Sequence, residues 1–129
     1  MNFDWEDFFL LAQNLAERAD AEPLAAAMYR TAVSRAYYAM FCTARNELRD
    51  TVEDYSPLEC GSEHLYVWNS YREDRHPRGT RQIGVLGNRL RRYRNRADYC
   101  DVVLDLADLV EDAMDDAREL KTHLEGLRV

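Results

Sequence analysis

The sequence predicts an all-α fold, an up-and-down bundle of four long helices and one short helix, in a single domain spanning residues 1–129. Two observations support this prediction. Apolar residues recur at steps of three and four along most of the chain, which is the period of an amphipathic helix. No run alternates with the period of two that is typical of a strand. A chain of this length forms one domain with one core.

The first helix is expected to begin after Asn2 or Asp4, either of which can cap it, and to end near Asp20. Pro23 cannot donate to a continuing helix but suits the first turn of a new one. The first two helices are therefore predicted to be antiparallel neighbours. The apolar stripe predicted to face the core of the first helix consists of Trp5, Phe8, Leu11, Ala12 and Leu15.

The second helix is predicted to run from Pro23 to about Thr51, because no Gly or Pro interrupts it. Residues 36–41 are apolar or aromatic on every side, which is typical of the central helix of a bundle. Ser34 and Tyr38 lie four residues apart on one face, so their hydroxyls need partners if they are buried.

A connection with Pro57 and Gly61 should lead to a short helix that begins at Ser62, its N-cap, and ends near Tyr71. The inward positions of this short helix are predicted to be Leu65, Trp68 and Tyr71. Residues 72–80 are polar and contain Pro77 and Gly79. We expect them to form an exposed loop that buries nothing and is available to RNA or a partner.

The fourth helix is rich in arginine. Its apolar stripe consists of Ile83, Leu86, Leu90, Tyr93 and Ala97. Arg94 lies about 40° from Leu90 and therefore at the edge of this stripe, where an unpaired guanidinium is costly. Arg94 thus needs an anion, from the protein or from a ligand. The other four arginines should project away from the stripe and act as interchangeable charge; they are Arg89, Arg91, Arg92 and Arg96.

The last helix is expected to begin near Asp98 or Asp101. It carries an apolar seam of the heptad kind, made of Val103, Leu106, Val110, Ala113, Ala117, Leu120, Leu124 and Leu127. This seam can serve the bundle itself or a second subunit. Together with the aromatic residues of the second helix, it predicts a homodimer.

The net charge of −7 hides a strong partition: residues 1–71 carry −7, residues 72–96 carry +7 and residues 97–129 carry −7. Such a chain is not suited to coating nucleic acid nonspecifically, but its basic segment can hold a few phosphates. Alternatively, that segment pairs with its acidic neighbours inside the bundle. The start of the chain has no signal-peptide pattern, and no run is apolar enough to span a membrane, so the protein is predicted to be cytoplasmic.

Cysteine usage points to neither disulfides nor metal. Cys42, Cys60 and Cys100 are odd in number and widely spaced, as expected for reduced thiols. Cys60 and His64 lie four residues apart, but no second pair of ligands accompanies them, so we predict no zinc site. No cofactor is expected.

Two stretches carry a family resemblance. The segment RNRADY at 94–99, after a basic amphipathic helix, and the upstream SRAYYAMF at 34–41 resemble the HEPN superfamily of small prokaryotic helical proteins, in particular its branch ending in A-D-Y. The family motif is an Arg, usually followed by a polar residue, with a His a few positions later. Arg94 and Asn95 match it, and Tyr99 stands at the His position. Ser62 and His64 resemble the Ser-His pair that opens the third helix of the family, with Glu63 between them.

The resemblance implies an RNA-binding protein that acts as a metal-independent endoribonuclease or toxin. Such a protein would belong to a toxin-antitoxin or defence system and would be paired with a minimal nucleotidyltransferase. It also implies a homodimer that pairs its Arg motifs across a two-fold axis. The catalytic residues carried over are Arg94, Asn95, Tyr99 and His64. The residues expected to bind nucleic acid or a nucleotide are Arg35, Tyr38, Arg91, Arg92, Arg96 and Asp98.

Cleavage of RNA without a metal needs a base for the 2′-hydroxyl and a cation for the phosphorane. Arg94 supplies the cation, whereas Tyr99, with a reference pKa near ~10, is a poor base. In a straight helix the two residues point about 140° apart, so a break near residues 98–101 is expected if they share a site. His64 is the alternative base, provided that the third helix lies beside the fourth.

Two further hypotheses remain open. In one, the chain is a catalytically inactive HEPN module that binds a nucleotide, RNA or a partner protein. In the other, it is a structural bundle in which Arg94 pairs internally, for example with Asp98, Asp101 or an acid of the last helix.

Overall fold

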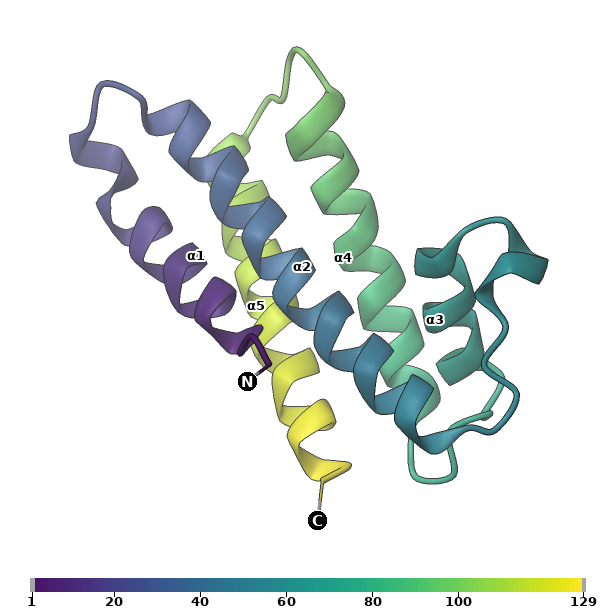
Figure 1. Cartoon of the computed structure of the whole chain (residues 1–129). Coiled ribbons are helices and arrows are strands. Elements are labelled where there is room, and N and C mark those ends of the chain that lie inside the picture. Colours follow the sequence, from purple (N-terminus) through teal and green to yellow (C-terminus); the bar gives the residue numbers. More distant parts are fainter. Residues whose placement is uncertain (1, 129) are drawn as a thin grey trace.

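The computed structural model describes residues 2–128, apart from the side chains of Glu59 and Cys60. The described residues form five α-helices and two short 3-10 turns, with no strand among them, so the predicted all-α class is confirmed (Figure 1). The helices are α1 (Glu6–Arg18), α2 (Ala25–Thr51), α3 (Glu63–Arg72), α4 (Arg81–Tyr99) and α5 (Leu106–Gly126). The four long helices run alternately up and down, and the shorter α3 lies on the outside of α4 (Figure 1).

Helix α2 is the centre of the structure, as its sequence predicts. It packs against α1 on one side and against α4 and α5 on the other. Ala36, Tyr37 and Met40 are all at most 1% exposed, because neighbouring helices cover α2 on several sides. This position lets α2 contribute side chains to any site on α4.

For helix α1, the predicted cap is confirmed and part of the predicted buried face is wrong. The carboxylate of Asp4 accepts a hydrogen bond from the amide of Glu6 at 3.0 Å, so Asp4 caps the helix as expected. Leu11, predicted to be buried, is 44% exposed, and Phe9 is buried in its place. Residues 8–11 are all apolar, so the pattern alone could not fix the rotation of the helix. Packing on α2 chose the face that contains Phe9 and Ala12.

Helices α3 and α4 pack unusually closely because two glycines of α4 face Trp68. A Cβ on Gly84 would lie 2.3 Å from the carbonyl oxygen of Trp68, and a Cβ on Gly87 would lie 2.1 Å from its indole ring. The hydroxyl of Ser62 caps α3 by accepting from the amide of Leu65, as predicted. The close packing holds α3 alongside α4.

The loop after α3 contradicts its prediction, because it buries His76, which is only 2% exposed. The His76 ring stacks on Tyr71, with ring centroids 5.6 Å apart. Its Nδ1 accepts from the amide of Arg78 at 3.0 Å, and its Nε2 lies 3.2 Å from a carboxylate oxygen of Glu47. A polar loop can therefore bury a histidine when both of its ring nitrogens have hydrogen-bonding partners.

Helix α5 begins at Leu106, later than the predicted Asp98 or Asp101, because α4 continues to Tyr99 and residues 100–105 cross to α5. Asp105 adopts a left-handed conformation, with φ of 52°, just before the helix. The seam members from Val110 to Leu127 are buried within the chain, where α5 packs on α2 and α4. The seam therefore serves the bundle, and the homodimer stays a prediction.

Candidate functional site

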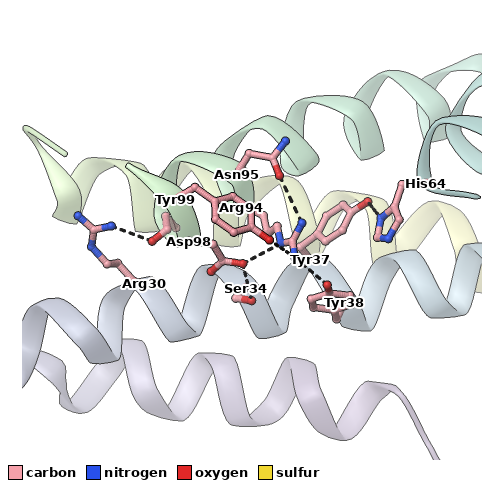
Figure 2. Close-up of polar contacts among 10 residues, drawn as sticks. Arg30, Ser34, Tyr37, Tyr38, His64, Arg94, Asn95, Asp98 and Tyr99 are labelled. Carbon is pink, nitrogen blue, oxygen red and sulfur yellow. Dashed lines mark hydrogen bonds and ion pairs between the residues drawn. The ribbon is translucent and has the colours of Figure 1, made fainter. Parts of the chain in front are cut away.

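Arg94 reaches from α4 towards α2 and is held by neutral oxygens from both helices (Figure 2). Its Nη2 donates to the hydroxyl of Tyr38 at 2.7 Å and, more weakly, to that of Tyr99 at 3.5 Å. Its Nη1 donates to the side-chain oxygen of Asn95 at 3.3 Å. The Arg94 side chain is only 14% exposed, so these contacts fix the position of the guanidinium.

The anion that the sequence requires for Arg94 is provided within the protein by Asp98. Nε of Arg94 lies 2.8 Å from Oδ2 of Asp98, one helical turn away. The N–H bond does not point at that oxygen, however, so the buried Nε makes no hydrogen bond. The same carboxylate oxygen of Asp98 accepts from the hydroxyl of Ser34 at 3.3 Å. The pair is thus close in distance but poorly aligned, which weakens it.

Three tyrosine rings surround the guanidinium of Arg94. Its central carbon lies 5.0 Å from the ring centroid of Tyr38, 5.4 Å from that of Tyr99 and 5.9 Å from that of Tyr37. Aromatic faces attract a cation without neutralising its charge. Arg94 therefore keeps its positive charge in a largely buried position.

Tyr99 meets Arg94 without the helix break that the sequence argument required. Helix α4 is continuous through Tyr99 and ends at Cys100. The break was expected because the two Cα positions diverge around the helix axis, but the long side chains of Arg94 and Tyr99 bridge that angle. Tyr99 itself is 71% exposed, so one wall of the site faces solvent.

Arg30 of α2 holds the end of α4 in place, and the sequence analysis missed it. Its guanidinium donates to the carbonyls of Ala97 at 2.9 Å, Cys100 at 2.6 Å and Asp101 at 3.2 Å. Carbonyls at the end of a helix lack partners within the helix, so Arg30 satisfies several of them at once. No local pattern marks this role, because Arg30 is about seventy residues away in the chain.

His64 is connected to the Arg94 site through Tyr37, a residue that the sequence analysis treated only as core (Figure 2). The indole N–H of Trp68 donates to the hydroxyl oxygen of Tyr37 at 3.0 Å, and that hydroxyl lies 2.6 Å from Nδ1 of His64. Tyr37 is fully buried, so its hydroxyl proton needs an acceptor, and Nδ1 of His64 is the acceptor available. This assigns the neutral His64 ring a proton on Nε2.

The surroundings of His64 also favour its neutral form. Burial lowers the pKa of His64 below its ordinary value near 6.5, and the positive charge of Arg94 lowers it further. Burial also raises the pKa of Tyr37, so its phenol stays protonated near neutral pH. The pair therefore presents His64 as a hydrogen-bond donor through Nε2, while Nδ1 is occupied.

The other predicted arginines behave differently from one another. Arg35 lies over the ring of Tyr38 at 5.2 Å, on the α2 side of the site. Arg91 is partly buried and donates to Asn88 at 3.2 Å, and its charge also lowers the pKa of His64. Arg92 and Arg96 are exposed, as expected.

Arg89 is not interchangeable with these arginines, which corrects the prediction. Its Nε and Nη2 donate to the two carboxylate oxygens of Asp116 on α5, both at 2.7 Å. Asp116 is buried, and its side chain is only 10% exposed. Arg89 thus joins α4 to α5 as a structural ion pair.

The structure therefore brings most of the predicted site residues into one region at the junction of α2, α3 and α4. Arg94, Asn95, Asp98, Tyr99 and Tyr38 are in direct contact, and His64 is joined to them through the tyrosines. The sequence already indicated that the hydroxyls of Ser34 and Tyr38 need partners, and these partners are Asp98 and Arg94. Such a site can bind a phosphate or another small anion.

Within residues 2–128, no group of three or more His, Cys, Asp or Glu side chains is placed to hold a metal ion. No helix of the described part is long and apolar enough to cross a membrane. No protein-family model, curated protein or solved structure matches this chain.

Proposed function

We propose that this chain is a HEPN-type RNA-binding module that holds a phosphate of single-stranded RNA at Arg94 without cleaving it. The observation that carries the proposal is the state of the Arg94 guanidinium. Neutral oxygens fix it in place, its close anion Asp98 is poorly aligned, the buried Nε–H makes no hydrogen bond, and one N–H of Nη1 remains as a free donor. A phosphate, with several acceptor oxygens, suits an arginine that is fixed in place and only partly compensated by a poorly aligned aspartate.

Binding is favoured over cleavage because the site lacks a well-placed base. Tyr99 stands where the related motif has His, and a phenol with a reference pKa near ~10 is a poor base at neutral pH. His64 is neutral near pH 7, but its Nδ1 already accepts from Tyr37, so its free nitrogen is a donor. This nitrogen is better suited to a hydrogen bond with a phosphate oxygen than to removing a proton.

The close contact with Asp98 favours a second hypothesis, in which Arg94 is only a structural partner within α4. The distance of 2.8 Å supports this alternative, and the missing hydrogen bond argues against it. The two hypotheses differ in one respect: a structural pair contributes to stability, whereas a binding arginine contributes to RNA affinity.

The test is the affinity for a short single-stranded RNA, measured by fluorescence anisotropy on the wild type and on Arg94 variants. Arg94→Ala is expected to lose affinity by roughly 10- to 100-fold, because a charge-assisted hydrogen bond contributes about 1.5–3 kcal/mol. Arg94→Lys keeps the charge but loses the fork, and it should be nearly as weak. The matched control is Arg92→Lys on the exposed face, which is expected to change affinity less than about twofold. Unchanged binding by folded Arg94→Ala would refute the proposal.

A cleavage assay in the presence of a chelator tests the second half of the proposal. Wild-type protein should leave RNA intact. Metal-independent cleavage that disappears in Arg94→Ala and His64→Asn would instead make the chain a ribonuclease of the HEPN type, the first function that the resemblance implies.

The proposed partners are a second copy of the chain and a minimal nucleotidyltransferase. Apolar residues lie exposed at the end of α4 and in the segment that follows: Tyr99 is 71% exposed, and Val102 and Leu104 are each 76% exposed. Exposed apolar side chains close together in the chain, beside the site, are the candidate for an interaction surface. Sedimentation that gives only a 15.1 kDa species at high concentration would argue against the homodimer.

A further inference from the structure

A hollow lined by aromatic rings lies next to the Arg94 site, where the start of α1 and the start of α3 meet α2. It has a volume of about 490 Å³, which is within the range of small-ligand sites. The rings that line it belong to Trp5, Phe8, Tyr38, Phe41 and His64. We call it the aromatic hollow.

Two arginines line the aromatic hollow and lie over its rings. The guanidinium of Arg35 lies 5.0 Å from the ring centroid of Phe8 and 5.2 Å from that of Tyr38. The guanidinium of Arg45 lies 5.8 Å from both the Trp5 and the Phe41 rings. Among the side chains that the structure describes, neither arginine forms an ion pair. Glu63 also lines the hollow, and its carboxylate accepts from the hydroxyl of Tyr55 at 2.5 Å. The hollow thus combines flat apolar surface with two arginines and one acid, a net positive lining.

One of its rings is already stacked, which shows that the walls suit flat groups. His64 lies on Phe41 with centroids 3.9 Å apart and planes 6° from parallel. Nucleic-acid bases bind to proteins in the same way, by stacking on aromatic rings and on guanidinium planes. The positive charge favours a ligand that is anionic as well as flat.

Tyr38 connects the aromatic hollow to the Arg94 site. Its hydroxyl accepts from Arg94, and its ring is approached by Arg94 at 5.0 Å and by Arg35 at 5.2 Å. A phosphate at Arg94 and a flat ring in the hollow would therefore be separated by a single side chain. A nucleotide has these two groups in one residue.

We propose that the aromatic hollow holds the base of the single-stranded RNA nucleotide whose phosphate lies at Arg94. This inference rests on the proposed function. Stacking on rings tolerates every base, so the hollow should add affinity with little sequence preference.

The experiment compares an RNA oligonucleotide with the same oligonucleotide carrying abasic residues throughout. Base stacking contributes about 1–3 kcal/mol per base, so the wild type should bind the intact RNA roughly 5- to 150-fold more tightly. Trp5→Leu should reduce this preference and leave affinity for the abasic RNA unchanged. Leu10→Ala, an exposed apolar position on the same helix that does not line the hollow, is the matched control and should keep the full preference.

Intrinsic fluorescence gives a second readout that does not depend on a variant folding. The chain has two tryptophans, of which Trp68 is fully buried and Trp5 lines the hollow. Intact RNA should quench the emission of Trp5 because a base stacks in the hollow, and abasic RNA should not.

The outcomes separate the two proposals. Equal binding of intact and abasic RNA, with Arg94→Ala weakening both, would overturn the base site and leave the phosphate site supported. A preference for intact RNA that is unaffected by Arg94→Ala would refute the phosphate site and, with it, the combined nucleotide site. Quenching that rises with protein concentration alone would show that a second copy fills the hollow, which would also overturn this inference.

Discussion

The two halves of α4 differ in how fully their residues are engaged in packing and hydrogen bonds with the rest of the protein. In the first half, residues 81–90, Gly84 and Gly87 leave no space against Trp68, and Arg89 makes two aligned hydrogen bonds with Asp116. In the second half, residues 91–99, Arg94 lies equally close to an aspartate but makes no hydrogen bond with it. The first half packs the bundle, and the second half leaves Arg94 with hydrogen-bonding capacity that the fold does not use.

Two arginines five residues apart on α4 therefore have different roles. Arg89 bonds to an acid on another helix, so its contact carries tertiary structure. Arg94 pairs with an acid on its own helix, which does little to hold helices together.

Gly84→Ala should destabilise the protein most. The new Cβ would lie 2.3 Å from the carbonyl oxygen of Trp68, which belongs to the backbone and cannot rotate away. Overpacking costs about 1–3 kcal/mol or more, against a gain of ~1 kcal/mol in helix propensity. We expect urea denaturation to show a net loss of roughly 2 kcal/mol. The control is Gly126→Ala, whose Cβ has nothing within 4 Å and which should be neutral or slightly stabilising. Equal stability of the two variants would contradict the close packing of α3 on α4.

Arg89→Ala should cost roughly 1.5–2 kcal/mol, because it leaves the buried carboxylate of Asp116 without either hydrogen bond. Arg92→Ala removes the same charge from an exposed position and should change the free energy of unfolding by less than about 0.5 kcal/mol. If both variants lose the same stability, the loss comes from net charge and not from the ion pair.

Asp98→Asn and Asp116→Asn make the same change in the two arginine–aspartate pairs. Asp116→Asn is expected to lower stability by about 1–2 kcal/mol and to leave RNA affinity unchanged. Asp98→Asn should cost only about 0.5 kcal/mol, the scale of an ion pair within one helix. Because it removes the anion that competes for Arg94, it should also raise RNA affinity severalfold. A larger stability loss for Asp98→Asn than for Asp116→Asn would identify Arg94 as a structural residue.

His64 should give the smallest effect, seen as pH dependence. Because its pKa is lowered in the folded protein, the unfolded chain binds more protons at acidic pH. The contribution of His64 to the free energy of unfolding is therefore complete well above the pKa of histidine in the unfolded chain, near ~6.5. It is lost as the pH falls towards the lower pKa of His64 in the folded protein. The variant His64→Asn keeps an acceptor for Tyr37 but does not titrate. Wild type should therefore lose more stability than His64→Asn between neutral and mildly acidic pH, as measured by urea denaturation. A parallel decline of the two proteins would contradict the shift.

Features that depend on neighbouring residues in the chain could be predicted from the amino-acid sequence. The period of apolar residues predicted five helices in the observed order, although α5 begins at Leu106 and not near Asp98 or Asp101. The caps Asp4 and Ser62 were identified from their types and positions. The same reasoning showed that Arg94 needs an anion, because a guanidinium at the edge of an apolar stripe is costly wherever the helix packs.

Packing in three dimensions settled which side chains meet across the helix interfaces. It selected Phe9 over Leu11 in a run where every residue is apolar, and it chose Asp98 as the anion for Arg94. It also connected His64 to Trp68 through Tyr37, and placed Arg30 at the end of α4. These contacts join residues up to about seventy positions apart, mostly on different helices. A helical period records which face is buried, but it carries no information about the side chains that face it across the interface.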